Sequence, residues 1–444
     1  MTVDLALKNA KILLNGKIVK AGIAVEKGKI VKIAKDTNLP AASKEIDVKG
    51  FAILPGIIDT HVHLRDQELT YKEDFITGTS AAANGGVTTV FDMPNNKPVT
   101  MDVHTLRERI NLAAKKAIVN VGFYSAFPND VKEIPGIIQE GAIGFKLYMS
   151  EKIGGLDPDC DEALTEAFTE TQKTNVPVCV HAEDRRLLES VRTEMERKKD
   201  NDVEAYLKVH SPDAELKAID RAVKIARKSR AKIHFCHVST AEGLQSIKFA
   251  KQARFPVTCE ATPHHLLLSF ESLKNLGAVG LTNPPLRSED DVRLLWAGLQ
   301  KGTIDILASD HAPHSLNDKK KPEIWQVASG IAGLETMLPL MLTQVNKGLL
   351  SLPRLVHLTS KRPAEIFKIR KRGEIKEECS ADLVVVDLKK EWKIDSSKFY
   401  SKAKFSPFDG WKVKGKPVKT FVNGSQVMDN GEIVASPEQG HIIR

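Results

Sequence analysis

The stretch Gly56-Ile57-Ile58-Asp59-Thr60-His61-Val62-His63-Leu64-Arg65 decides the expected fold, because an apolar run ends here in a His-x-His pair followed by an arginine. Residues two positions apart on a β-strand point to the same side, so the imidazoles of His61 and His63 can reach one metal ion. For an isolated pair, an edge strand with two exposed histidines is the alternative interpretation. Further ligand candidates at the ends of other apolar runs favour the metal site.

The chain between residues 51 and 370 alternates apolar runs with helical periodicity. Helix-like segments such as 105–117, 161–173, 213–228 and 241–253 separate the runs. This alternation indicates an α/β protein and favours a (β/α)8 TIM-like barrel over an open doubly wound sheet. The C-terminal ends of barrel strands meet at one mouth, where such folds carry out their chemistry. The expected strands span residues 51–58, 87–92, 119–123, 144–148, 178–181, 232–237, 255–260 and 304–310.

Both ends of the chain have the pattern of short strands punctuated by Gly and Asn, including a turn at Asn15-Gly16. Such short strands need partners to be stable. We therefore expect residues 1–50 and 371–444 to form one small β-sandwich domain, closed around a barrel of residues 51–370. The length of 444 residues leaves room for this second domain.

The composition argues against several classes of protein. The formal net charge of +8 is spread over lysine-rich segments, without the basic runs interleaved with aromatic residues that bind nucleic acid. The five cysteines are an odd number without a CxxC motif, which argues against a disulfide scaffold. Residues 1–20 do not resemble a signal peptide, and no apolar stretch is long enough to span a bilayer. We expect a cytoplasmic protein with no nucleic-acid or membrane partner.

Polar residues at the ends of the expected strands form a set of metal ligands. Imidazoles and a carboxylate suit Zn²⁺ and similar divalent ions, and a hydrolytic metal keeps one position open for water. The expected ligands are His61, His63, Lys146, His181, His237 and Asp310.

Lys146 is the unusual member of this set, because an ammonium group repels metal ions. It lies within the apolar run Gly144-Phe145-Lys146-Leu147-Tyr148, so it must be neutral, paired or chemically modified. A snorkelling or ion-paired lysine is the alternative interpretation. A carbamate formed from Lys146 and CO2, N6-carboxylysine, would supply a carboxylate that bridges two metal ions about 3.5 Å apart. The set then predicts two Zn²⁺ ions per chain.

Longer motifs of the chain resemble those of the amidohydrolase superfamily and, within it, the class I dihydroorotases. The superfamily resemblance rests on residues 55–63, 144–146, 181–183, 237–239 and 309–314. The narrower resemblance rests on residues 63–66, 92–96, 283–287, 330–336 and 406–411. One departure is Gln67-Glu68-Leu69, where many relatives have Pro-Gly, so the resemblance does not predict the shape of that loop.

The resemblance implies the reversible hydrolysis of (S)-dihydroorotate to N-carbamoyl-L-aspartate in de novo pyrimidine (UMP) biosynthesis. It also implies that Arg65, Asn95 and His314 bind the substrate carboxylate, while Asn283 and the backbone near Gly330 hold the ring. The chemistry agrees, because a planar guanidinium binds a carboxylate through two parallel hydrogen bonds. For the two asparagines, which lie beside prolines, a role in a turn is the alternative interpretation.

Asp310 is the expected proton shuttle of this reaction. Metal ions lower the pKa of bound water, so a metal-bound hydroxide would attack the ring carbonyl. Asp310 would accept the hydroxide proton and return it to the departing ring nitrogen. The segment 149–159, which directly follows the bridging-lysine strand, is an expected lid over the substrate.

Three further residues near the expected mouth have weaker signals. Cys236 and Glu260 end neighbouring strands, and the resemblance implies a third zinc at matching residues in some relatives. His311 follows Asp310 directly and should point away from it, so we interpret His311 as structural.

Two other functions stay open at this point. A hydantoinase or allantoinase would share the metal ligands, and only Arg65, Asn95 and the run 283–287 favour an acidic pyrimidine ring. A non-catalytic scaffold that binds partners would be expected to lose ligands, and none is lost here. The sequence does not decide whether the chain forms a homo-oligomer or a complex with other pyrimidine-pathway enzymes.

Overall fold

In the computed structural model, which describes residues 2–14 and 16–444, eight parallel strands form a barrel. Each strand hydrogen-bonds to the next one in chain order. An isolated parallel bridge between Val62 and His311 joins the first strand to the segment after the last, so the barrel is nearly closed. The strands are β6 (Ile57–Val62), β7 (Val87–Asp92), β8 (Asn120–Ala126), β9 (Ala142–Tyr148), β10 (Val178–His181), β11 (Ile233–Phe235), β12 (Val257–Ala261) and β13 (Ile306–Leu307).

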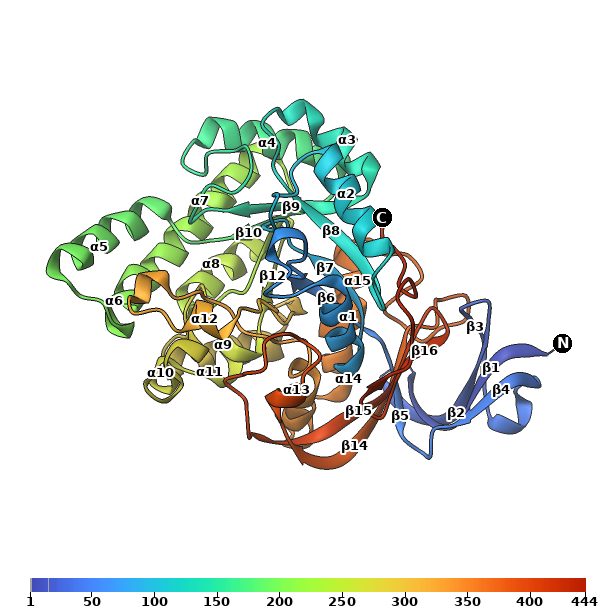
Figure 1. The fold of residues 1–444 in the computed structure, drawn as a ribbon. Helices are drawn as coiled ribbons and strands as arrows, with labels where there is room; N and C mark the ends of the chain where they lie inside the picture. Colours follow the sequence, from blue (N-terminus) through green and yellow to red (C-terminus); the bar gives the residue numbers. More distant parts are fainter. Residues whose placement is uncertain (1, 15) are drawn as a thin grey trace.

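Helices cover the outside of the barrel (Figure 1). Side chains of Asp74, Asp102 and Ser211 accept backbone hydrogen bonds at the first turns of three of them, which satisfies N–H groups that a helix leaves free. No helix in the described part of the chain is long and apolar enough to cross a membrane. The helices are α1 (Phe75–Asn84), α2 (Val103–Ala114), α3 (Ile134–Glu140), α4 (Asp161–Thr174), α5 (Arg185–Lys198), α6 (Val203–Val209), α7 (Pro212–Ser229), α8 (Ala241–Gln252), α9 (Pro263–Leu267), α10 (Phe270–Leu276), α11 (Glu289–Lys301), α12 (Leu316–Lys319), α13 (Met337–Asn346), α14 (Leu352–Val356) and α15 (Arg362–Ile366).

Both ends of the chain contribute to a second sheet beside the barrel (Figure 1). Its order among the described strands is β17-β16-β15-β14-β5-β1-β2-β3, with β4 paired to β1, so C-terminal strands lie next to N-terminal ones. The strands are β1 (Val3–Leu14), β2 (Lys17–Glu26), β3 (Lys29–Ala34), β4 (Ala42–Asp47), β5 (Ala52–Pro55), β14 (Leu383–Lys393), β15 (Lys412–Val422), β16 (Ser425–Asp429) and β17 (Glu432–Ile433).

The predicted fold, a (β/α)8 barrel with a small β domain from both termini, is therefore confirmed. The domain boundaries at residues 50 and 370 stay a prediction. Asn15 of the predicted turn lies outside the described residues.

The expected strand 51–58 is in fact two strands that belong to different sheets. Strand β5 pairs with β1 and β14 of the terminal sheet, whereas β6 pairs with β7 of the barrel. The chain changes sheets at Gly56, whose N–H donates to Asp382 O at 2.9 Å. A Cβ at this position would collide with the side chain of Thr88, so only glycine lets the chain pass. The Pro55-Gly56 pair is a turn signal at this point, but the apolar residues on both sides of it were interpreted as one strand.

Aromatic packing fills the barrel interior. The ring of Phe367, just after α15, lies 5.0 Å from Phe91 and 5.9 Å from both Tyr124 and His234, measured between ring centroids. These three side chains come from three different strands of the barrel. The interior is thus a packed core, and the open end that remains is the mouth formed by the C-terminal ends of the strands.

Candidate active site

A cavity of about 200 Å³ lies at the C-terminal ends of the barrel strands. Most of the residues that the sequence predicted for the site line this cavity, whereas Lys146, Cys236, Glu260 and His314 are not among its lining residues. The predicted residues in the lining are His61, His63, Arg65, Asn95, His181, His237, Asn283, Asp310 and Gly330.

Three ligand atoms converge at this mouth. The Nε2 atoms of His61 and His63 lie 3.3 and 3.4 Å from Oδ1 of Asp310, and all three side chains are buried. The two histidines share one side of β6, as the strand period predicts. Asp310 follows β13 with a left-handed backbone (φ 47°). The bridge between β6 and the residue after Asp310 brings this carboxylate to the imidazoles.

Two side chains fix the orientation of these imidazoles. Asn95 Oδ1 accepts a hydrogen bond from His63 Nδ1 at 2.7 Å, and Glu260 Oε1 accepts one from His61 Nδ1 at 2.5 Å. Glu260 also accepts a hydrogen bond from His234 Nε2 at 3.1 Å, which holds the carboxylate itself. With Nδ1 protonated in both metal-ligand candidates, the Nε2 lone pairs face the cavity, which is the tautomer a metal requires.

Burial sets the charge states of the site. It lowers the pKa of His61, His63 and His237, and neighbouring positive groups act in the same direction. Neutral imidazole is the form that binds metal ions. Burial raises the pKa of Asp310, although the charges of His61 and Lys146 oppose this shift. A carboxylate with a raised pKa is a stronger base, which suits a group that accepts a proton during catalysis.

Lys146, His181 and His237 form a second group beside the first. His181 Nδ1 and His237 Nε2 lie 3.1 Å apart, and Glu183 accepts a hydrogen bond from His181 Nε2 at 2.8 Å. Glu183 thereby directs the Nδ1 atom of His181 towards His237. The Nζ atom of Lys146 is 3.0 Å from Cys236 Sγ. This buried lysine thus faces a thiol, which is only a weak hydrogen-bond acceptor.

Cys236 and Glu260, the predicted third-metal residues, come together with His61. Their ligand atoms all lie within 4.8 Å of one another. Burial raises the pKa of Cys236 to about 12, despite the opposing charge of Lys146, so the thiol is protonated at neutral pH. The contacts of Glu260 with His61 and His234 already occupy both of its oxygens. In this arrangement the carboxylate supports His61.

Arg65 forms a positive wall of the cavity. Its side chain is buried, its backbone is left-handed (φ 56°), and one terminal nitrogen lies 3.3 Å from His314 Nε2. Lys72 Nζ lies 3.1 Å from the other ring nitrogen of His314. Burial lowers the pKa of His314, and the charges of Arg65 and Lys72 act in the same direction, so this imidazole is neutral. Within the described residues the Nε atom of Arg65 has no hydrogen-bond partner.

Asn283 and Gly330 also line the cavity. Asn283 Oδ1 is buried and has no hydrogen-bond partner among the described residues. Gly330 has φ 143°, and a Cβ there would collide with the backbone oxygen of Ala312. Its N–H donates to Leu281 O at 2.8 Å, which ties the two loops together. Both predicted substrate residues are therefore brought to the cavity by loops that depend on each other.

The sequence did not predict several residues of the lining. Tyr148 could have been found, because it follows Lys146 by two positions on one strand and so points to the same side. Tyr206 holds two lining loops together through hydrogen bonds to Thr282 O (3.0 Å) and Ser329 Oγ (2.8 Å), and no local pattern indicates this role. Movement of the predicted lid, residues 149–159, stays a prediction. The unpredicted lining residues are Tyr148, Glu151, Ala312 and Ser329.

The donor set fits a divalent metal ion. Ligand atoms placed tetrahedrally at about 2.0–2.1 Å from Zn²⁺ are about 3.4 Å apart. The observed separations between Asp310 Oδ1 and the Nε2 atoms of His61 and His63 are 3.3 and 3.4 Å. The separation between His181 and His237 is 3.1 Å. The ligand atoms of the first group and the two imidazoles of the second are thus spaced as ligands of metal ions.

Comparison with known proteins gives concordant results. Residues 52–427 match the sequence profile of the Amidohydrolase family. The dihydroorotase of Methanothermobacter thermautotrophicus is 37% identical over 97% of this chain and 95% of its own length. The dihydroorotase of Pyrococcus abyssi is 40% identical over 98% of this chain and 97% of its own length. Among solved structures, the L-hydantoinase (dihydropyrimidinase) of Arthrobacter aurescens is similar, with a TM-score of 0.95, 33% identity and 99% coverage of both chains.

Proposed function

Since this chain belongs to the amidohydrolase family, we propose that it is a dihydroorotase, which interconverts (S)-dihydroorotate and N-carbamoyl-L-aspartate by metal-dependent hydrolysis. Relatives named dihydroorotase, 37% and 40% identical over nearly the full length, support this substrate. The reaction is the ring-opening of a cyclic amide that carries one carboxylate. In the cell it would serve pyrimidine biosynthesis.

The single observation that carries the proposal is the buried guanidinium of Arg65 in the cavity wall. It lies in the lining that also contains His61, His63 and Asp310, and its Nε–H has no partner among the described residues. A buried cation with unused donors is costly unless a ligand supplies the counter-charge. A substrate carboxylate provides that charge, whereas a neutral hydantoin ring does not.

The polar neighbours complete the binding site for this substrate. Since Asn95 uses its oxygen to accept from His63, its amide N–H₂ is available to donate to the carboxylate. Arg65 and His314 lie within 3.3 Å of each other and would bind the same group. Asn283 and the backbone of Gly330 would hold the ring amide and carbonyl on the other side.

The metal ligands of the proposal are those expected from the sequence, with two Zn²⁺ ions and N6-carboxylysine at Lys146. When bound, such ions lower the pKa of water and polarise a carbonyl group. The buried, mid-strand position of Lys146 supports a carbamate, because a carbamate would supply oxygen ligands that the amine lacks. Cys236 and Glu260 stay candidates for a third zinc. The six proposed ligands of the two ions are His61, His63, Lys146, His181, His237 and Asp310.

Asp310 carries the proton in this proposal. Its raised pKa makes it a base that accepts a proton from the attacking water and then returns it to the departing ring nitrogen. Arg65 and Asn95 hold the carboxylate so that the reacting carbonyl lies next to Asp310. In the direction of ring closure, the same groups act in reverse order.

The replacement Arg65→Met tests the substrate assignment. The parent enzyme should open dihydroorotate in preference to the uncharged analogue dihydrouracil. In the variant, KM for dihydroorotate should rise by the equivalent of about 2–5 kcal/mol, because a buried carboxylate loses its paired cation. KM for dihydrouracil should change little.

Arg293→Met provides the matched control. It removes the same charge from the exposed surface of α11 and should leave both KM values unchanged. Equal losses for charged and uncharged rings in Arg65→Met would contradict the assignment of Arg65 to the carboxylate.

A second candidate function is the opening of five-membered hydantoin rings, because the chain is similar to an L-hydantoinase. Assays of hydantoin and allantoin beside dihydroorotate decide between the two. A higher kcat/KM for hydantoin in the parent enzyme would overturn the proposed substrate. A cytoplasmic location and association with itself or with other pyrimidine-pathway enzymes also stay predictions.

A further inference from the structure

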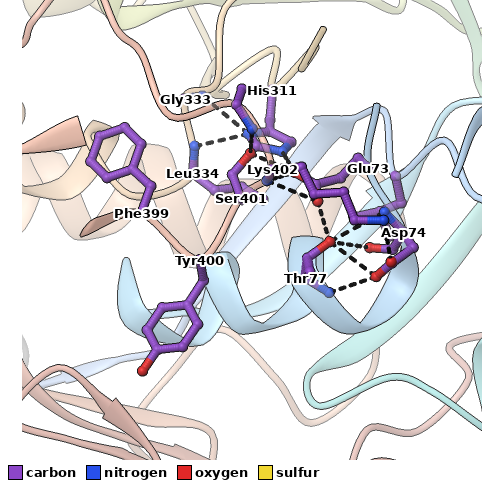
Figure 2. Close-up of polar contacts among 12 residues, drawn as sticks. Glu73, Asp74, Thr77, His311, Gly333, Leu334, Phe399, Tyr400, Ser401 and Lys402 are labelled. Carbon is purple, nitrogen blue, oxygen red and sulfur yellow. Dashed lines mark hydrogen bonds and ion pairs between the residues drawn. The ribbon is translucent and has the colours of Figure 1, made fainter. Parts of the chain in front are cut away.

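We propose that two residues of the C-terminal segment, Ser401 and Lys402, position the proton-carrying Asp310 through Glu73 and His311. Figure 2 shows this cluster, in which the C-terminal segment meets the barrel. We call Ser401 and Lys402 the C-terminal clasp. The inference rests on the proposed function, because it assigns the clasp a role in the same reaction.

The backbone of His311 joins three parts of the active site. It directly follows Asp310, whose backbone is left-handed. Its carbonyl oxygen accepts a hydrogen bond from His63 N at 2.8 Å, and a parallel bridge links it to Val62. A second bridge links His311 to Ile331, next to Gly330 of the cavity lining. A shift of His311 would therefore move the base, a metal-ligand candidate and a substrate-binding loop together.

His311 is not among the residues that line the cavity, and its side chain lies in a polar cage (Figure 2). Its Nδ1 atom accepts hydrogen bonds from Gly333 N at 3.1 Å and Leu334 N at 3.4 Å. The ring proton is therefore on Nε2. That N–H faces the Glu73 carboxylate, with Nε2 3.5 Å from Oε2, which is longer than a normal hydrogen bond. Glu73 thus faces the one edge of the ring that the backbone does not hold.

Glu73 is itself held by the clasp. Its side chain is fully buried, so its charge requires hydrogen-bond donors. Ser401 Oγ donates to it at 2.5 Å and Lys402 N lies 3.3 Å from both oxygens, while Thr77 supplies a further donor from α1. Two of these donors come from a segment more than 300 residues away in the chain. Without them, the carboxylate would lose its position opposite His311.

Other contacts make the clasp a fixed point. Glu335 accepts hydrogen bonds from Ser401 N at 3.2 Å and Tyr400 N at 3.0 Å. Lys402 Nζ lies 2.6 Å from Asp74 Oδ2, at the N-terminus of α1. The clasp therefore stays anchored to the barrel when a single contact to Glu73 is removed. This is the property that makes a selective test feasible.

The replacement Ser401→Ala tests the proposal, with Ser401→Thr as the conservative variant. Removing the hydroxyl should lower kcat about tenfold, the lower end of the effect of losing a supporting partner at a metal site. KM should stay within about twofold, because the substrate contacts are untouched. Ser401→Thr retains the hydroxyl and should restore most of the parent kcat.

Tyr400→Phe is the matched control from the same segment. Its hydroxyl points away from His311 (Figure 2) and donates to Gly431 O at 3.0 Å. Tyr400→Phe should lower Tm by about as much as Ser401→Ala does, but its kcat should equal that of the parent enzyme. Equal kcat values for Ser401→Ala and Tyr400→Phe, or a change confined to Tm, would overturn the role of the clasp.

Glu73→Gln is a second variant for the case in which Ser401→Ala does not fold. It keeps the shape of the side chain and should show the same loss of kcat at unchanged KM, with unchanged zinc content. If neither variant folds, the cluster serves stability alone and the proposal is wrong. A parent enzyme that opens no dihydroorotate would contradict the proposed function instead, and the clasp would then be judged on the cyclic amide that the parent does open.

Discussion

The two halves of the proposed metal centre differ in what holds them together. In the first half, an amide and a carboxylate orient the two imidazoles, and the ligand atoms already have metal-site spacing. In the second half, two histidines are correctly spaced, but the lysine faces a thiol. The first half consists of His61, His63 and Asp310, and the second of Lys146, His181 and His237.

If the proposed carbamate is correct, side chains alone specify the first half, whereas the second half needs a group that the sequence does not encode. A lysine side chain has no acceptor atom while it is charged. Only reaction of Lys146 with CO2 would give it the oxygens that connect the two halves. The second half should therefore depend on conditions to which the first half is insensitive.

The largest expected effect concerns Asp310, the residue of the first half that also carries the proton. Asp310→Asn keeps the shape of the side chain but removes the base, so kcat should fall by about 10² to 10⁴. Zinc content, measured on the same sample, should stay near that of the parent. Asp290→Asn on the exposed surface of α11 is the control, with no expected change. A metal-loaded Asp310→Asn enzyme with nearly full turnover would rule out the proton-shuttle role.

The next largest effect is expected for Lys146, because its replacement should affect the two halves of the metal centre differently. Lys146→Ala removes the bridge, so the variant should keep one zinc ion, bound by the first half, and lose the second. Turnover should fall by at least about 10- to 100-fold. Loss of a residue that only supports a metal ligand already has an effect of this size. Short carboxylates such as acetate or propionate should partly restore both metal content and activity, because they supply the missing oxygens.

Reconstitution of the apoenzyme gives the matching control without a mutation. Zinc added to the parent enzyme in buffer free of CO2 should bind with a stoichiometry near one per chain, and addition of bicarbonate should raise it to two. Full loading and activity in the absence of CO2 would contradict the carbamate, and would favour an unmodified Lys146 beside a single functional metal.

The strands of the barrel could be predicted from the sequence. Strands of a parallel barrel are buried on both faces, so their apolar runs are visible in the sequence, and all eight were found. The break at Gly56 was missed although Pro55-Gly56 is a turn signal, because apolar residues lie on both sides of the pair. The switch between sheets depends on Thr88 and Asp382, which reach Gly56 only through the tertiary fold.

The residues of the candidate site that lie at the ends of strands could be predicted from the sequence. The strand period and the rule for strand ends place His61, His63 and Asp310 at one mouth, and the cavity lining contains all three. The residues that were missed, such as Tyr206 and Ser401, act from helices and loops whose position depends on packing of the whole chain. Local sequence patterns do not contain that information.

The smallest expected effect is a change in zinc affinity. It concerns the two carboxylates that orient histidines in the two halves of the metal centre. Glu260 accepts from His61 Nδ1, and Glu183 accepts from His181 Nε2, both in buried surroundings. The replacements Glu260→Gln and Glu183→Gln are matched, because each keeps the acceptor oxygen and removes one charge. Each should weaken zinc binding about tenfold, since a charged partner makes the imidazole a stronger ligand.

Zinc titration of the two apoenzymes shows which half each carboxylate serves. Without CO2, only the first half binds, so Glu260→Gln should weaken this binding step and Glu183→Gln should leave it unchanged. With bicarbonate, the second binding step appears and Glu183→Gln should weaken that step. If both variants weaken the CO2-independent step equally, the two groups of ligands bind metal as one unit. The zinc affinity of the first half would then depend on Glu183, which contacts none of its three residues. In that case the first half would not be a preformed metal site.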